Sequence, residues 1–253
     1  MANFHLEVKV ISRGRAQSIT SAVSYISGRK LFDAYKGTRY YHSRKDVLYC
    51  EVFQPYNAPA EFHNLQYLCN AIDGAEKRYD SRTGRVFIGS LPNELPVSEL
   101  ISIVHEFVQE NFVKQGLCAV AAIHQGQNRT DPSRNNPHVH IITSTRTVGP
   151  EGFSPKKDRE YNQRKYVRVW RESWAHVQNL AYERNGLDIR VSHESLEVQG
   201  VRREPAIHLS RIDWQKEHRG ERTPSGDRKR AIRERNRQHQ RNPERELEIV
   251  PTR

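Results

Sequence analysis

Residues 117–145 constrain the fold of this chain most, because two apolar runs are joined there by a polar loop. The runs, Leu117–His124 and His138–Thr145, are rich in alanine and β-branched residues, whereas the loop Gln125–Pro137 is polar and ends in proline. This pattern predicts two strands that pair antiparallel.

Other periodic stretches complete the outline. Apolar and polar residues alternate over positions 4–11, which predicts a further, half-buried strand. Helical spacing predicts amphipathic helices over Ser18–Ser27, Ser98–Lys114 and Val167–Asn185, each followed closely by a glycine. Strands and helices that do not alternate regularly are typical of the α+β class.

The charge of the chain points to an anionic partner. Lys and Arg number 41 against 30 Asp and Glu, so the formal net charge is +11. Such a surplus favours a polyanion, of which nucleic acid is the commonest in a cell, although a merely basic protein would show it too.

Neither a disulfide framework nor a membrane span is expected. Cys50, Cys69 and Cys118 are scattered and odd in number, which suits a reducing compartment. No apolar run approaches the roughly 18–20 residues that cross a bilayer, and residues 1–5 do not resemble a signal peptide. We therefore expect a cytoplasmic protein with no membrane insertion.

Two segments hold much of the positive charge. Residues 216–245 contain 11 Lys or Arg against 5 Asp or Glu and almost no apolar side chains, which predicts a basic tail, disordered or helical around Asp227–Gln240. We accordingly divide the chain into a domain of residues 1–212 and a tail of residues 213–253.

The second segment, Lys156–Arg171, interleaves seven basic residues with aromatic ones. That composition suits a single nucleic-acid strand, although a solvated helix face explains it equally well. The candidate DNA-binding residues are Arg13, Arg15, Lys156, Lys157, Arg164, Lys165 and Arg168.

Three histidines are the candidate metal ligands. His138 and His140 are two apart on a predicted strand, so their side chains share one face. His124 ends the partner strand and can lie beside them. Three converging imidazoles form a metal site with an open position, whereas surface or core histidines are the alternative.

Tyr25 is the candidate nucleophile. It falls outside the apolar stripe of the helix predicted over Ser18–Ser27, so its side chain should face outward. A phenol has a pKa of about 10 and attacks poorly at neutral pH without a metal or a general base nearby. A surface tyrosine without function is the alternative, and Tyr35, Tyr40 and Tyr41 are next in line.

Several short runs spread along the chain occur together in one known family. They include Ser12-Arg13-Gly14, Tyr25 to Leu31, Tyr41 to Val47, Leu91 to Leu95, Asn136 to His140 and His193 to Val201. Through them the sequence resembles the MobA/MobL relaxases that mobilise plasmids, over about residues 1–220.

The resemblance implies a fold and a reaction. The fold is a central antiparallel sheet flanked by helices, with the His-x-His pair on a central strand. Tyr25 would attack a phosphodiester at the plasmid transfer origin, leaving a 5′-phosphotyrosine and a free 3′-hydroxyl. His124, His138 and His140 would share one divalent ion, Mn²⁺ or Mg²⁺, with ring nitrogens within about 3–4 Å of each other.

The implied partners are single-stranded and supercoiled plasmid DNA at the transfer origin, accessory mobilisation proteins and a type IV coupling protein. One departure stands out. Family members commonly carry carboxylates at one or both of the positions held here by Val86 and Ile88. Glu76 and Asp80 lie nearby in sequence, but nothing in the sequence shows that either replaces them.

Two other functions stay open at this point. One is a tyrosine nickase of rolling-circle replication or transposition. The other is a non-catalytic basic protein that binds nucleic acid and uses its histidines to hold a structural ion.

Overall fold

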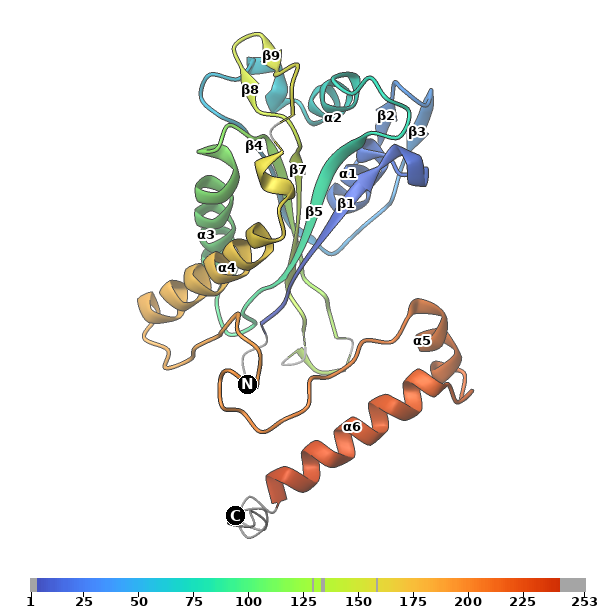
Figure 1. The fold of residues 1–253 in the computed structure, drawn as a ribbon, viewed down its shortest axis with the longest axis vertical. Coiled ribbons are helices and arrows are strands. Elements are labelled where there is room, and N and C mark those ends of the chain that lie inside the picture. The colour runs from blue at the N-terminus through green and yellow to red at the C-terminus, as the bar shows by residue number, and fades with distance from the viewer. Residues whose placement is uncertain (1–3, 129, 133–134, 158, 242–253) are drawn as a thin grey trace, which may run out of the picture. The chain divides into compact units, whose positions relative to one another are not determined.

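A five-stranded antiparallel sheet lies at the centre of the first of two units, Met1–His193, in the computed structural model (Figure 1). Its strands run in the order β1-β5-β7-β6-β4. They are β1 (Leu6–Ser12), β4 (Val47–Phe53), β5 (Arg82–Ser90), β6 (Ala119–His124) and β7 (His138–Ser144). The structure describes residues 4–128, 130–132, 135–157 and 159–241.

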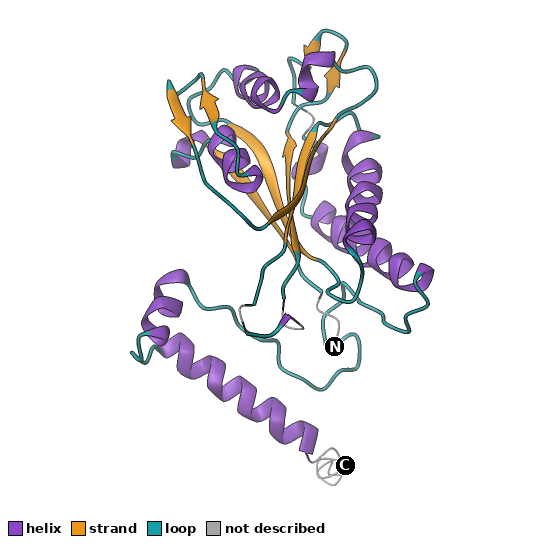
Figure 2. Ribbon diagram, turned by 180° about the vertical axis from the view of Figure 1, so that it is seen from behind, coloured by secondary structure: helices purple, strands orange, loops and turns teal. Residues whose placement is uncertain are grey.

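Helices cover both faces of this sheet (Figures 1 and 2). Helices α3 (Val97–Val108) and α4 (Lys165–Arg184) pack on one face, and α1 (Ile19–Ser27) and α2 (Leu65–Gly74) pack on the other. Every residue of β6 is buried, because alternate side chains enter the two different cores. The predicted α+β class, with a central antiparallel sheet flanked by helices, is confirmed.

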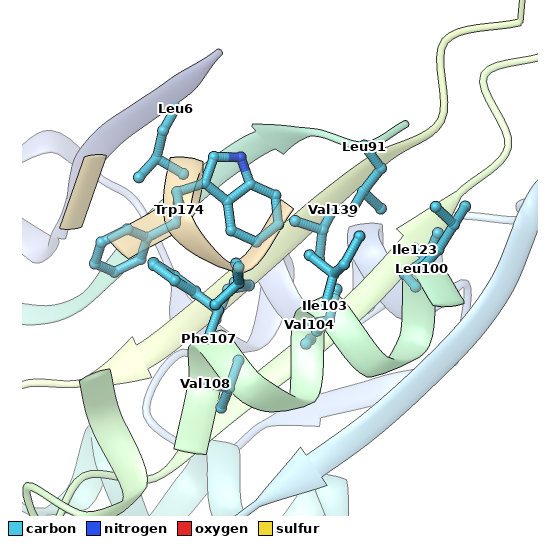
Figure 3. Packing of buried hydrophobic residues seen from close by; sticks show 14 of the residues in the cluster. Leu6, Leu91, Leu100, Ile103, Val104, Phe107, Val108, Ile123, Val139 and Trp174 are labelled. Atoms are coloured by element: carbon cyan, nitrogen blue, oxygen red, sulfur yellow. The ribbon is translucent and has the colours of Figure 1, made fainter. Parts of the chain in front are cut away.

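The core under α3 and α4 is aromatic. Trp174 is fully buried and lies edge-on to Phe107, with ring centroids 5.0 Å apart (Figure 3). It also contacts the sheet where Gly89 has no side chain, since a Cβ there would lie 2.8 Å from the indole. Gly89 therefore makes room for the tryptophan that joins α4 to β5.

The predicted elements correspond closely to the observed ones. The helix expected over Ser98–Lys114 is α3 followed by one π-helical turn, Gln109–Val113. Sequence periodicity gave no expectation for β4, β5 or α2. The remaining short elements are the ribbons β2 (Leu31–Asp33) with β3 (Thr38–Tyr40) and β8 (Val148–Gly149) with β9 (Gly152–Phe153), and the single turns Arg13–Arg15, Ala60–His63 and Glu160–Asn162.

The second unit, Glu194–Arg253, contains helices α5 (Arg211–His218) and α6 (Pro224–Arg241). Ion pairs within this unit join Arg230 to Glu217 and Arg235 to Glu204. Of the two forms predicted for the basic tail, the described part is helical. The boundary predicted after residue 212 falls in the first turn of α5 and stays a prediction about the extent of the functional domain.

Within the described residues, no helix combines the length and the apolar character that a membrane span requires.

Candidate metal and nucleophile site

The three candidate histidines come together on the face of the sheet that carries α1. His124 on β6 pairs directly with His138 on β7, and His140 follows two residues later on the same face. One nitrogen from each ring lies within 4.8 Å of the others. This separation is wider than the 3–4 Å expected around a shared ion, but it places all three rings around one point.

Two backbone carbonyls fix which nitrogens face that point. The Nε2–H of His124 donates to the carbonyl of Ile26 at 2.7 Å, and the Nδ1–H of His138 donates to the carbonyl of Asn136 at 2.7 Å. The opposite nitrogen of each ring, Nδ1 of His124 and Nε2 of His138, then carries a lone pair. Nδ1 of His124 is buried and has no hydrogen-bond partner among the described residues, as expected for a nitrogen that coordinates a metal ion.

The environment favours the neutral form of His124 and His140. The pKa of His140 is lowered to about 3, mainly by burial, and the neighbouring His124, His138 and Arg44 contribute to this lowering. Burial is also the main cause that lowers the pKa of His124. Neutral imidazoles are the form that binds metal, so the donor set fits a borderline divalent ion.

Tyr25 lies beside this cluster. It is on α1, whose Ile19, Val23 and Ile26 are buried, whereas Tyr25 itself is 47% exposed. Its ring is edge-on to His140, with centroids 6.2 Å apart. The prediction that Tyr25 faces outward is therefore confirmed, and the outward direction leads to the histidines.

The alternative tyrosines lie in other settings. Tyr35 lies beneath the guanidinium of Arg13, 3.8 Å from its ring centroid, and Tyr40 ends the β2–β3 ribbon. Tyr41 is 62% exposed. Of these four tyrosines, it is Tyr25 whose ring lies edge-on to a ring of the histidine cluster.

Strand β5 gives the cluster no acid. Ile88 pairs with His140, and Val86 pairs with Ile142, so both aliphatic side chains lie on the histidine face. The carboxylate of Glu76 is instead held by Arg146 and Lys157, each at 2.9 Å. Asp80 is likewise paired, to Arg78 at 2.8 Å.

Sequence reasoning missed three residues next to Tyr25. His42 is edge-on to the Tyr25 ring, with centroids 5.7 Å apart, and the guanidinium carbon of Arg44 lies 4.7 Å from the ring centroid. Asp46 forms an ion pair with Arg44. All three lie in the run Tyr41–Val47, which carries part of the family resemblance. The motif was therefore visible in the sequence, but it did not indicate a role for any of these residues.

The structure corrects one of the DNA-binding predictions. Arg13 is buried, and its guanidinium donates to the carboxylate of Asp73 and to the backbone carbonyls of Asp73, Glu76 and Arg78. A side chain occupied in this way supports the α2–β5 connection and is not available to a phosphate. Arg15, two residues later, is exposed.

The other predicted basic residues lie at or near the surface. Lys156, Arg164, Lys165 and Arg168 are exposed, with Lys165 paired to Glu160, whereas Lys157 is partly buried against Glu76. Lys156 and Lys157 also line a cavity of about 720 Å³ between the start of β5 and the segment after β9. Its described walls carry eight Lys or Arg side chains against two acidic ones.

Comparison with known proteins gives a consistent result. Residues 17–219 match the model of the MobA/MobL family. The chain is 28% identical over 251 residues to the probable mobilization protein MobA of Bifidobacterium longum, an alignment that covers 82% of this chain and 43% of that protein. It is 28% identical over 249 residues to mobilization protein A of Escherichia coli, covering 90% of this chain and 32% of that protein.

One solved structure is similar over its entire length. It is described as the molecular basis of vancomycin resistance transfer in Staphylococcus aureus, and it is 28% identical with a TM-score of 0.70. The similarity covers 77% of this chain and 100% of that one. In contrast, the chain spans less than half the length of the two curated relatives.

Proposed function

The chain belongs to the MobA/MobL family, and on this premise we propose that it is a DNA relaxase that nicks one strand at a plasmid transfer origin. The observation that carries the proposal is the position of an exposed tyrosine at a three-histidine cluster. The rings of Tyr25 and His140 lie edge-on to each other, with centroids 6.2 Å apart. One phosphate could therefore reach the phenol and the histidines together.

The proposed reaction is a transesterification on phosphorus. The phenolic oxygen of Tyr25 forms a bond to the phosphorus as the bond from phosphorus to the 3′ oxygen breaks. The phenol loses its proton, and the leaving 3′ oxygen gains one. The products are a 5′-phosphotyrosine and a free 3′-hydroxyl, and the covalent link keeps the phosphodiester energy available for religation.

We propose that His124, His138 and His140 hold a divalent ion, Mn²⁺ or Mg²⁺, for this reaction. When bound, the ion would supply positive charge to the non-bridging phosphate oxygens. The chain contributes the orientation, since the carbonyls of Ile26 and Asn136 fix two of the rings. Three nitrogen donors favour Mn²⁺ over Mg²⁺ or Ca²⁺.

Basic side chains are proposed to hold the strand by its phosphates. On the first unit these are Arg15, Lys156, Lys157, Arg164, Lys165 and Arg168, and the basic tail of residues 213–253 adds charge. The cavity lined by Lys156 and Lys157 supports this, because its walls have a surplus of six positive charges, eight minus two. Contacts of this kind position a strand but do not read its sequence.

The proposed setting follows from the family. We place the reaction in the cytoplasm, on single-stranded and supercoiled plasmid DNA at the transfer origin. Accessory mobilisation proteins and a type IV coupling protein are the proposed partners.

The test is direct. The chain is incubated with supercoiled plasmid that carries the intergenic region adjacent to its gene, with Mn²⁺ or Mg²⁺, and then denatured and treated with protease. A relaxase gives a nicked circle whose 5′ end is blocked by a tyrosyl peptide. DNA binding without any adduct would make the protein a non-catalytic binder, and an adduct at a replication origin instead would make it a replication nickase.

A further inference from the structure

An arginine locked by a carboxylate lies against the proposed nucleophile. Nε and Nη2 of Arg44 donate to the two carboxylate oxygens of Asp46 at 2.9 and 2.7 Å, a bidentate pair. The Arg44 side chain is 17% exposed, so water screens this pair only partly. The hydrogen bonds from Arg44 are the main reason why the pKa of Asp46 falls to about 2.

The backbone around this pair is fixed at both ends. The carbonyl of Asp46 accepts a hydrogen bond from the backbone N–H of Gln125 at 2.8 Å, next to His124. At the other end, Gly28 closes α1 with a φ of +67°, and a Cβ there would lie 3.4 Å from Cβ of Arg44. The segment is thus held against both the last turn of α1 and the end of β6.

The guanidinium of Arg44 covers the ring that this segment faces. Its carbon lies 4.7 Å from the centroid of the Tyr25 ring, and the rings of His42 and His140 are both edge-on to the same ring. An exposed tyrosine near the end of a helix would otherwise sample several rotamers. Here a cation held at two points restricts that motion.

We propose that Arg44, held by Asp46, is a positioning residue that keeps the phenol of Tyr25 turned toward the histidine cluster. The inference rests on the proposed function for its role in catalysis. It also accounts for a carboxylate near the site, although β5 places no acidic residue beside the histidines and has Val86 and Ile88 at the positions in question. In this proposal Asp46 fixes the position of the Arg44 side chain, and Arg44 in turn fixes the orientation of the Tyr25 ring.

The first test needs no DNA. The protein is labelled with 3-fluorotyrosine, and the ¹⁹F resonance of Tyr25 is assigned by its loss in Tyr25→Phe. In Arg44→Gln we expect this resonance to shift and sharpen, because the ring gains freedom, whereas Arg184→Gln should leave it unchanged. Arg184 is a matched control, since it is also held by carboxylates, those of Glu99 and Glu106. An unchanged Tyr25 resonance in Arg44→Gln would overturn the inference.

The second test separates positioning from binding. Covalent capture of a saturating single-stranded oligonucleotide is timed in a single turnover, while its Kd and the affinity for Mn²⁺ are measured separately. Arg44→Gln and Asp46→Asn should slow capture by about 10- to 100-fold at saturation, with both affinities within about threefold. Arg44→Lys should recover part of the rate, because it restores the charge but not the bidentate pair.

The opposing outcomes are distinct. A weakened Kd with a normal rate at saturation would make Arg44 a strand-binding residue, and a parallel loss of Mn²⁺ affinity would assign the pair to the histidines. Either result overturns the inference. If the unsubstituted protein forms no adduct, the proposed function fails, while the ¹⁹F experiment still decides whether Arg44 positions the ring.

Discussion

The Nε2–H of His124 donates to the backbone carbonyl of Ile26 at 2.7 Å, which joins a central strand directly to the helix that carries Tyr25. Ile26 is the residue after Tyr25, so the bond sets the height of the phenol relative to the histidines. The same bond leaves Nδ1 of His124 as the ring nitrogen with a lone pair available to a metal ion. One hydrogen bond therefore couples the proposed nucleophile and the proposed metal ligands.

Replacing Tyr25 by phenylalanine should abolish covalent capture of DNA. The hydroxyl contributes little to ground-state affinity, so strand binding should stay within about twofold. The adduct is measured on a denaturing gel and binding by fluorescence anisotropy, with Tyr41→Phe as the control. Retained cleavage in Tyr25→Phe would move the role to Tyr35, Tyr40 or Tyr41.

The metal-free protein should lose stability as the pH falls from about 6.5 toward 3. An ordinary histidine has a pKa of 6.5, whereas that of His140 is lowered to about 3, so in this range the unfolded chain binds more protons. One such group contributes at most about 1.4 kcal/mol per pH unit. Urea unfolding with chelator at pH 7.5 and 5.0 measures this, and His140→Gln should show a smaller difference between the two values. An equal difference in both proteins would contradict the prediction.

Gly126→Ala should weaken metal binding without touching a ligand. A Cβ at Gly126 would lie 2.1 Å from the carbonyl oxygen of Asn136, which is the acceptor that orients His138. Loss of an outer partner of this kind typically costs about 10- to 100-fold in metal affinity. Calorimetric titration with Mn²⁺ tests it. Gly37→Ala is the control, because its φ is also positive but nothing lies within 4 Å of its Cβ.

Removing Lys156 and Arg164 together should make DNA binding less sensitive to salt. Each phosphate contact on a single strand contributes about 0.7 to the slope of log Kd against log salt, so two contacts contribute about 1.4. The slope is measured by anisotropy from about 50 to 300 mM NaCl. A double variant of Lys114 and Arg184, which removes the same charge from residues paired to glutamates, should keep the original slope. No change in the Lys156/Arg164 variant would remove these residues from the DNA surface.

Gly89→Ala should destabilise the domain by about 1–3 kcal/mol, the usual cost of overpacking a core. The added Cβ would lie 2.8 Å from two carbons of the fully buried Trp174 ring. Gly74→Ala, at the end of α2 with open space around its Cβ, should be neutral or slightly stabilising. Thermal unfolding followed by circular dichroism compares the two, and equal midpoints would contradict the packing argument.

The sequence by itself determined much of the local structure. Alternation and helical spacing located β1, β6, β7, α1, α3 and α4, because these periodicities depend only on the geometry of each element. The same geometry placed His138 and His140 on one face and turned Tyr25 out of the apolar stripe. Helix α2 and strands β4 and β5 were not predicted, because the apolar residues in these segments show no periodicity strong enough to identify them from their own sequence.

Only the tertiary structure decided which charged side chains are held by internal partners and which are available for contacts with DNA or with Tyr25. Arg13 and Arg15 look alike in sequence, but Arg13 is buried against Asp73, a partner 60 residues away. Arg44 and Asp46 gain their place beside Tyr25 because the segment before β4 packs on the end of α1. Burial and ion pairing depend on contacts between segments that are distant along the chain. No pattern within a single segment can encode them, since the partner that fixes each charge is supplied by the folded chain.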